Sequence, residues 1–268
     1  MTAGTQAGPL AGTGVLVTRP AHQAGSLCRL VEAAGGHAVR FPVLEISATL
    51  PQASAALLAR LASFDLAIFI SANAVEHGLA AARAHGPWPP GLERAAIGRA
   101  TAAALEAQGL PPAICPAGPF DSETLLQHPD LQAVAGQRIV IFRGVGGREL
   151  LAETLRARGA EVAYAEVYRR RRPSADPAPL LARWRAGAID IVVVTSREGL
   201  ANLWRLLGPE GQPLLRATQL VAASDRVLQL AAELAIRPTP VVAREASDAG
   251  LLEAVIACRR LLRTTREQ

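Results

Sequence analysis

Hydroxyl, amide and guanidinium side chains recur where predicted strands end. Short apolar runs rich in β-branched residues predict buried strands, and each is followed by a small or polar turn and a helical pattern. The polar residues at these strand ends are Arg19, Ser71, Asn73, Arg99, Thr101, Arg143, Thr195, Ser196, Ser224 and Arg226. Helix N-termini carry unpaired N–H groups and partial positive charge, so these positions favour an anionic ligand. Any one hydroxyl alone is better explained as a plain helix cap, and Ser122 and Asp248 are predicted to cap the helices that follow them.

Residues 139–173 contain the most complete unit of this kind. Ile139–Phe142 predicts a buried strand, and the glycines of Gly144–Gly147 allow a sharp turn. Residues 148–158 have helical spacing that ends at a glycine, and 162–168 form a second extended run before four arginines. The pattern predicts a strand, a glycine turn, a helix, and a second strand that is followed by a run of arginines.

The whole chain alternates strands with helices, which favours parallel sheets covered by helices on both faces. Three pairs of strand landmarks recur about 125 residues apart, and they are Val15 with Ile139, Phe64 with Ile189, and Ala95 with Val221. This spacing predicts two similar α/β lobes. In such folds ligands bind beyond the carboxyl ends of the strands, here in a cleft between the lobes.

Composition excludes several classes of protein. The net charge is +5, yet the sequence has no lysine, so the basic residues are all arginines, which suit two-point contacts with carboxylates. The arginines are spread along the chain, and no groove-reading helix is evident, so we expect no nucleic-acid partner. No apolar run is long enough to span a membrane, and residues 1–13 predict a disordered leader. The scattered Cys28, Cys115 and Cys258 favour reduced thiols and a cytoplasmic location.

The usual motifs of cofactor and metal enzymes are missing. The five histidines, His77 among them, show no H-E-x-x-H spacing and are expected at the surface or in loops. The sequence has neither a P-loop nor a G-x-S-x-G motif. The glycines after residue 143 only faintly imitate a dinucleotide fingerprint. We therefore expect no cofactor and no metal, and a cleft that binds a large polyanion.

A series of short motifs along the chain resembles the uroporphyrinogen-III synthase family. The motifs are Val-Leu-Val-Thr-Arg-Pro (15–20), Phe-Pro-Val-Leu-Glu-Ile (41–46), Phe-Asp-Leu-Ala-Ile-Phe-Ile-Ser-Ala-Asn-Ala-Val (64–75), Ile-Gly-Arg-Ala-Thr-Ala (97–102), Asp-Ser-Glu-Thr-Leu-Leu (121–126), Phe-Arg-Gly-Val-Gly-Gly-Arg-Glu-Leu-Leu (142–151), Val-Tyr-Arg-Arg (167–170) and Val-Val-Thr-Ser (193–196). Each motif is weak alone. Together they follow the family's order over about residues 14–255.

The resemblance implies a discontinuous lobe of residues 1–40 and 173–268, and a second lobe of residues 49–162. Two linker strands, 41–48 and 163–172, would join them. Pro42 and the arginine run suit exposed linker strands. The fold class expected is therefore α/β, with two similar lobes, each a parallel sheet flanked by helices, and a cleft between them.

The activity that the resemblance implies is closure of hydroxymethylbilane with inversion of its last pyrrole ring and loss of water. Positioning of the substrate would matter more than strong acid–base groups. Hydroxymethylbilane is then the small-molecule partner, and the upstream bilane-forming enzyme is a candidate protein partner. We expect a monomer, because no long apolar stripe is left over.

Tyr168 matches a tyrosine that recurs in the family, and its phenol would act as a general acid at the leaving hydroxyl. An aromatic packed at a lobe hinge is an equally good interpretation. The remaining substrate-binding candidates are Arg19, Ser71, Asn73, Arg99, Thr101, Ser122, Arg143, Gly144, Arg148, Thr195, Ser196, Ser224 and Arg226. The family's Thr-Ser pair reads Ile70-Ser71 here, and the turn at 222–226 departs from the family's glycine-containing turn.

Two other hypotheses compete with the enzyme. A non-catalytic two-lobed module that binds a tetrapyrrole or another anion would keep the fold without turnover. A nucleotide-sugar transferase would need much larger lobes than this chain provides.

Overall fold

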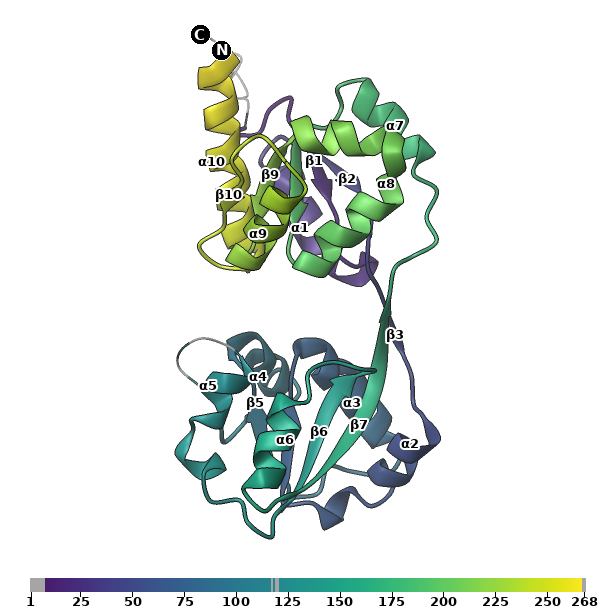
Figure 1. Cartoon of the computed structure of the whole chain (residues 1–268), viewed down its shortest axis with the longest axis vertical. Coiled ribbons are helices and arrows are strands. Elements are labelled where there is room, and N and C mark those ends of the chain that lie inside the picture. The colour runs from purple at the N-terminus through teal and green to yellow at the C-terminus, as the bar shows by residue number, and fades with distance from the viewer. Residues whose placement is uncertain (1–7, 117, 119–120, 267–268) are drawn as a thin grey trace, which may run out of the picture. The chain divides into compact units, whose positions relative to one another are not determined.

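The computed structural model describes residues 8–116, 118 and 121–266 (Figure 1). The chain divides into two compact units. The terminal unit contains the chain up to Glu45 and again from Arg171 onward, and the central unit is Ile46–Arg170. Each unit is built around its own five-stranded sheet.

The sheet of the terminal unit has the strand order β10-β9-β8-β1-β2, and all of its strand pairs are parallel. Its strands are β1 (Gly14–Val17), β2 (His37–Arg40), β8 (Ile191–Val194), β9 (Gln219–Ala222) and β10 (Val241–Val242). Its helices are α1 (Ala21–Ala33), α7 (Ala178–Arg185), α8 (Arg197–Ala217), α9 (Asp225–Glu233) and α10 (Asp248–Arg266). The inner strands are buried throughout their length, as parallel strands between two helical layers must be.

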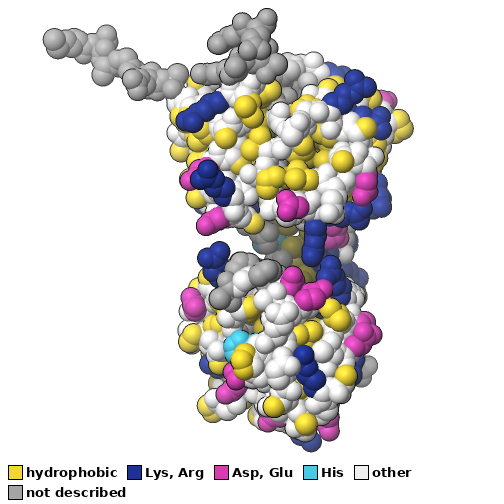
Figure 2. All heavy atoms as spheres, turned by 60° about the vertical axis from the view of Figure 1, so that its left-hand side comes forward, with side chains coloured by type: hydrophobic (Ala, Val, Ile, Leu, Met, Phe, Trp, Pro, Cys, Tyr) yellow, Lys and Arg dark blue, Asp and Glu magenta, His cyan; other side chains and the backbone are white. Residues whose placement is uncertain are grey.

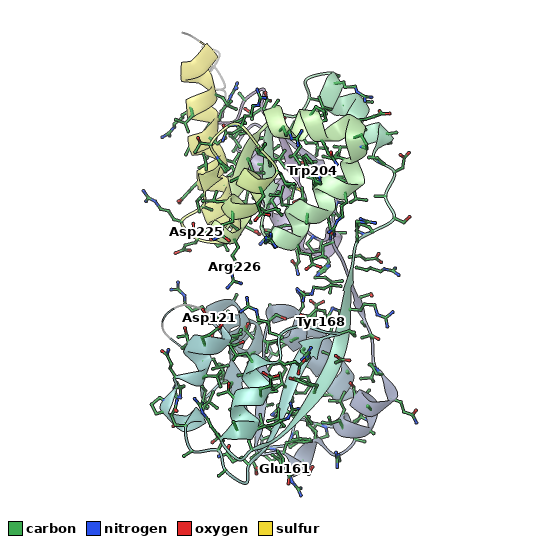
Figure 3. All side chains as sticks on the ribbon, in the orientation of Figure 1. Asp121, Glu161, Tyr168, Trp204, Asp225 and Arg226 are labelled. Atoms are coloured by element: carbon green, nitrogen blue, oxygen red, sulfur yellow. The ribbon has the colours of Figure 1, made fainter. Side chains whose placement is uncertain are left out.

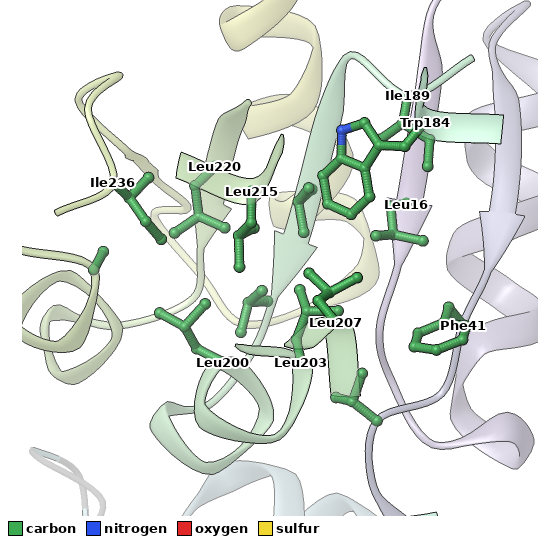
Figure 4. Close-up of a cluster of buried hydrophobic side chains, with 14 of the residues drawn as sticks. Leu16, Phe41, Trp184, Ile189, Leu200, Leu203, Leu207, Leu215, Leu220 and Ile236 are labelled. Atoms are coloured by element: carbon green, nitrogen blue, oxygen red, sulfur yellow. The ribbon is translucent and has the colours of Figure 1, made fainter. Parts of the chain in front are cut away.

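Both faces of this sheet are covered. Leu27 of α1 and Val255 of α10 belong to the core on one face. Trp184 of α7 and Leu203 of α8 belong to the core on the other, together with Leu16 and Leu220 from the sheet (Figure 4). This arrangement is the doubly covered parallel sheet that the strand–helix alternation predicts.

The central unit has the strand order β3-β7-β6-β4-β5. Its strands are β3 (Glu45–Ala48), β4 (Leu66–Phe69), β5 (Glu93–Ala96), β6 (Arg138–Gly144) and β7 (Glu161–Arg171). Its helices are α2 (Gln52–Leu58), α3 (Ala72–Arg83), α4 (Arg99–Glu106), α5 (Ser122–Leu126) and α6 (Leu150–Ala157), with 3₁₀ turns at Leu61–Ser63 and Pro129–Leu131. Residues of α2, α3 and α4 pack on one face, and residues of α5 and α6 on the other.

The two sheets share one topology. The order β2-β1-β8-β9 in the terminal unit corresponds to β7-β6-β4-β5 in the central unit, so β1 matches β6, β8 matches β4, and β9 matches β5. These are the three pairs that the repeat of about 125 residues predicts. In doubly wound sheets of this order, the chain reverses direction across the sheet between two central strands, and ligands bind there. The two switch points are β1/β8 and β6/β4.

Both predicted linker strands are partly buried, although exposed strands were expected, and in the first of them Phe41 and Val43 belong to the core of the terminal unit. In the second, residues 163–172 were expected to form an exposed linker strand, but β7 pairs with β6 from Glu161 to Tyr168. Ala165 and Val167 are buried in the core of the central unit. The apolar alternation that precedes the arginines therefore marks a sheet strand, and Arg169–Arg171 are its exposed end.

Three local predictions need correction. The stretch 8–13 was expected in a disordered leader, but Leu10 is buried and its N–H donates to the Ala34 carbonyl; residues 1–7 lie outside the described residues. Asp121, not Ser122, caps α5 by accepting from the Thr124 N–H. Ser247, not Asp248, accepts from the Gly250 N–H at the start of α10.

The arginines of the described chain are scattered, as expected. On the face shown in Figure 2 they stand among acidic and apolar side chains. Several form exposed ion pairs, as Arg171 does with Glu45 and Arg185 with Glu210. Among the described residues, no helix combines the length and the apolar character needed to cross a membrane.

Candidate functional site

The predicted polar residues gather at the carboxyl ends of the parallel strands. In the central unit, Ser71 follows β4 and Gly144 ends β6, so the two residues flank the β6/β4 switch point. Tyr168 stands opposite Gly144 on the neighbouring strand β7. Figure 3 shows Tyr168 at the opposite end of β7 from Glu161. This edge is the position at which the fold binds ligands.

Tyr168 and Ser71 form a pair of hydroxyl groups. Their oxygen atoms are 3.1 Å apart, and either group can be the donor. Ser71 is the N-cap of α3, and its Oγ accepts a hydrogen bond from the Ala74 N–H at 3.0 Å. Tyr168 is buried, whereas Ser71 is half-buried, so the serine is the more accessible member of the pair.

A β-bulge turns Tyr168 toward Ser71. Arg143 pairs with Glu166, but the next residue of β6, Gly144, pairs with Tyr168, so β7 has one extra residue at Val167. Side chains normally alternate along a strand, yet Val167 and Tyr168 both belong to the core on the α3 face. The bulge therefore moves Tyr168 from the α6 face to the face on which α3 begins, as bulges beside active sites often do.

Gly144 makes room for the tyrosine ring. A Cβ at this position would lie 2.7 Å from a carbon of the Tyr168 ring, too close for any side chain. The Val145 N–H donates to the Tyr168 carbonyl at 2.8 Å. Gly144 is thus needed here for the close approach of an aromatic ring. The resemblance made it a ligand residue instead, and that role stays a prediction.

Arg143 lies on the opposite face and is buried, with 3% of its surface exposed. Its Nε donates to the Gly146 carbonyl at 3.0 Å, and its Nη1 donates to Glu149 at 3.1 Å. The guanidinium carbon lies 4.2 Å from the centre of the Tyr164 ring. A buried charge requires such partners, so these contacts engage Arg143 within the protein.

The same cluster shifts two pKa values. The hydrogen bond from the Tyr164 hydroxyl, together with that from Arg143, lowers the pKa of Glu149. Burial raises the pKa of Tyr164, and its hydrogen bond to Glu149 raises it further. The hydroxyl oxygen of Tyr164 is 2.5 Å from Oε2 of Glu149. Both shifts keep this pair in the form with a neutral phenol and an ionised carboxylate at neutral pH.

The terminal unit has a related edge at the β1/β8 switch point. Ser196 caps α8 by accepting from the Gly199 N–H at 3.0 Å, as Ser71 caps α3. Thr195 is half-buried beside it, and the buried Thr18 at the end of β1 donates to the Val193 carbonyl. Arg19 forms an ion pair with Asp248 at the start of α10.

Ser224 and Arg226 lie at the start of α9. Ser224 is the N-cap residue, but its side chain makes no capping hydrogen bond. Arg226 is exposed and extends away from the first turn of the helix (Figure 3). Both residues are therefore at the carboxyl edge of this sheet, next to the end of β9.

The other predicted residues of the central unit lie in or near first helical turns. Asn73 is half-buried in α3, Arg99 is exposed at the first position of α4, and Thr101 is buried two residues later. Ser122 begins α5, and the exposed Arg148 lies 3.5 Å from Glu123 of that helix.

Three residues of the central unit were missed or misjudged from the sequence. His77 was expected at the surface or in a loop, but it lies in α3 with its ring centre 5.8 Å from that of Tyr168. Its Nε2 atom is buried without a hydrogen-bond partner among the described residues. Glu149 and Tyr164 were not among the candidates, although Glu149 lies within the 142–151 motif, and only their contacts with Arg143 reveal them. Strand alternation, which places Tyr164 and Glu166 on one face, was the one available signal.

Comparison with known proteins identifies the family. The family described as "Uroporphyrinogen-III synthase HemD" matches residues 26–253. The chain is 39% identical to the uroporphyrinogen-III synthase of Escherichia coli (strain K12) over 242 residues, which cover 88% of this chain and 97% of that protein. It is 35% identical to the Synechococcus elongatus enzyme of the same name, over 74% of this chain and 76% of that protein. The chain belongs to the uroporphyrinogen-III synthase family.

Solved structures show the same fold at low sequence identity. A mutant uroporphyrinogen III synthase from Thermus thermophilus aligns with a TM-score of 0.63 at 20% identity, covering 92% of this chain and 99% of that one. The uroporphyrinogen-III synthetase of Helicobacter pylori 26695 aligns with a TM-score of 0.59 at 13% identity, covering 91% and 99%. The predicted fold class of two helix-flanked parallel sheets is confirmed.

The lowered pKa of Glu149 can be tested by removing one hydroxyl. In Tyr164→Phe, the carboxylate loses its strongest hydrogen-bond donor, so its pKa should rise toward the ordinary glutamate value. In the unchanged protein, ionised Glu149 favours folding above its unfolded-state pKa, and this contribution is lost as the pH falls through the lower folded-state pKa. Side-chain ¹³C NMR titration of Glu149 measures the change. An unaltered pKa in Tyr164→Phe would contradict the assigned cause, and Glu153→Gln in the same helix is the control.

Proposed function

We propose that this chain is a uroporphyrinogen-III synthase that closes hydroxymethylbilane into uroporphyrinogen III. The observation that carries the proposal is 39% identity along nearly the whole length of the E. coli enzyme. The site at the carboxyl edge of the central unit supports it, because a hydroxyl pair there lies beside the switch point of the sheet. The reaction is a net loss of water and needs no group that changes oxidation state.

The reaction implies two tasks for the protein. The terminal hydroxyl must leave as water, which gives a cation conjugated with a pyrrole nitrogen. Attack by the substituted carbon of the last ring then forms a spiro intermediate, which fragments and closes again with that ring inverted. Since the free bilane closes without inversion, the protein must hold the chain in the folded geometry. Helix N-termini and arginines at the strand ends are suited to the acetate and propionate groups of such a substrate.

Tyr168 and Ser71 are arranged for the first task. Because Ser71 Oγ already accepts from the Ala74 N–H, its own proton can be donated to the Tyr168 oxygen. In that arrangement the phenol proton is free for the departing hydroxyl, and the serine stabilises the charge that develops on the phenol oxygen. Tyr168 is then the general acid and Ser71 its supporting donor.

The remaining candidates fall into two groups by geometry. We propose Asn73, Arg99, Ser122, Arg148, Thr195, Ser196, Ser224 and Arg226 as substrate-binding residues, because each is half-buried or exposed at a carboxyl edge. Thr101 and Gly144 lie at that edge but are buried. Arg19 already forms an ion pair with Asp248, so we expect it to contribute less to substrate binding than the exposed arginines. The cytoplasmic location, the monomeric state, and a contact with the bilane-forming enzyme stay predictions.

The proposal is tested by the isomer composition of the product. The purified protein receives freshly generated hydroxymethylbilane, the product is oxidised, and the uroporphyrin isomers are separated. We expect predominantly the type III isomer, whereas a protein-free control gives type I. If the protein also yields only type I, the chain is not a synthase, and a non-catalytic anion-binding module becomes the better account.

The roles of Tyr168 and Ser71 predict unequal losses from matched variants. Tyr168→Phe keeps the ring beside Gly144 but removes the proton donor, so kcat should fall by roughly a hundredfold. Ser71→Ala and Ser247→Ala each remove one helix N-cap and should each lower the free energy of unfolding by about 1 kcal/mol. Urea unfolding and steady-state kinetics measure both effects.

Only the Ser71 variant of this capping pair should also lower kcat, because Ser71 contacts the Tyr168 hydroxyl whereas Ser247 caps a helix of the other unit. Equal kcat values in Ser71→Ala and Ser247→Ala would show that Ser71 is simply a cap. An undiminished kcat in Tyr168→Phe would remove the phenol from the mechanism.

A further inference from the structure

The turn that follows β6 is held from several sides. Gly146 and Gly147 adopt positive φ angles of 74° and 118°, a conformation that favours glycine and costs chain entropy on folding. The Gly146 carbonyl accepts from Arg143, and the Gly146 N–H donates to Glu166 at 3.2 Å. The turn is therefore fixed by the side chains of β6 and β7 beneath it.

Arg143, Glu149 and Tyr164 form one connected cluster, which we call the arginine clamp. The guanidinium lies over the Tyr164 ring, both side chains donate to Glu149, and Glu149 is the N-cap residue of α6. The clamp thus links the end of β6, the middle of β7 and the start of α6. Its central cation is almost fully buried, so it has little surface left to present to a ligand.

The clamp and Tyr168 act on the same residue from opposite faces of the sheet. Arg143 immediately precedes Gly144, and Gly144 packs against the Tyr168 ring. The Val145 N–H, within the turn, donates to the Tyr168 carbonyl. A shift of the turn would therefore move both the backbone and the ring of Tyr168.

We propose that Arg143 is a positioning residue, which together with Glu149 and Tyr164 holds the 144–147 turn so that Tyr168 stays directed at Ser71. The inference rests on the proposed function only for its effect on catalysis. Its structural part concerns the placement of Tyr168 and stands independently. Arg143 then acts through its contacts with Gly146, Glu149 and Tyr164. It does not bind the substrate directly, although the sequence had suggested that role.

The chain offers a selective probe for this proposal, because it contains only two tyrosines, Tyr164 and Tyr168. Protein labelled with ¹³C on the tyrosine rings gives signals for these two residues alone, and the spectrum of Tyr164→Phe assigns the Tyr168 signal. Glu149→Gln is the test variant, since it preserves shape and removes the charge that faces Arg143. Glu153→Gln is the matched control, because Glu153 is an exposed residue of the same helix.

We expect Glu149→Gln to shift the Tyr168 signal and to lower kcat by roughly tenfold in protein that urea titration shows to be folded under the assay conditions, although the loss of the charge facing Arg143 lowers its unfolding midpoint. Glu153→Gln should change neither the signal nor kcat. The loss of kcat should also disappear when Glu149→Gln is made in Tyr168→Phe protein, since the clamp would act through the phenol. An unmoved Tyr168 signal and an unchanged kcat in Glu149→Gln would overturn the proposal.

The experiment separates this proposal from the proposed function. If the unchanged protein forms no type III isomer, the synthase activity fails, yet the Tyr168 signal still decides whether the clamp positions the ring. If the activity is present and the signal does not move, the clamp proposal alone fails. A kcat loss of equal size in both backgrounds would likewise assign Glu149 a role separate from Tyr168.

Discussion

The close approach of the Tyr168 ring to Gly144 is the constraint on which the site in the central unit depends. A Cβ at residue 144 would collide with the ring, and the ring reaches this position only because β7 has an extra residue at Val167. Without the bulge, strand alternation would direct the tyrosine to the α6 face, away from Ser71. One extra residue in a strand thus determines which face of the sheet carries the phenol.

The shared topology explains why hydroxyls recur in both units. Each sheet has a switch point. The helix that follows β4 in the central unit is capped by Ser71, and the helix that follows β8 in the terminal unit is capped by Ser196. Each serine satisfies one N–H of its helix and leaves other N–H groups of the first turn for a ligand. A substrate with many carboxylates suits a fold that has such helix ends in two copies. The central unit alone adds a tyrosine to its serine.

The sequence predicted the fold more fully than the site, for identifiable reasons. Apolar runs and turns mark parallel strands strongly, so the repeat linking Val15 with Ile139 predicts matching strands. The bulge at Val167 leaves no such mark, because it depends on the register between β6 and β7. Arg143 looked like a ligand, since the charge of an arginine is visible in a sequence whereas its burial against Glu149 and Tyr164 is not. Helix caps were misplaced by one residue at Ser122 and Asp248 because adjacent residues could each serve.

We propose that an anionic tetrapyrrole binds at the carboxyl edges of the parallel strands. Adding uroporphyrin III, the oxidised product, to ¹⁵N-labelled protein and following the backbone amide signals tests it most directly. We expect the largest shifts at 71–74, 144–148 and 196–199, at the ends of β4, β6 and β8. Shifts concentrated at the other end of the central sheet, in the cavity lined by Arg60, Ser63, Arg138 and Glu161, would contradict it.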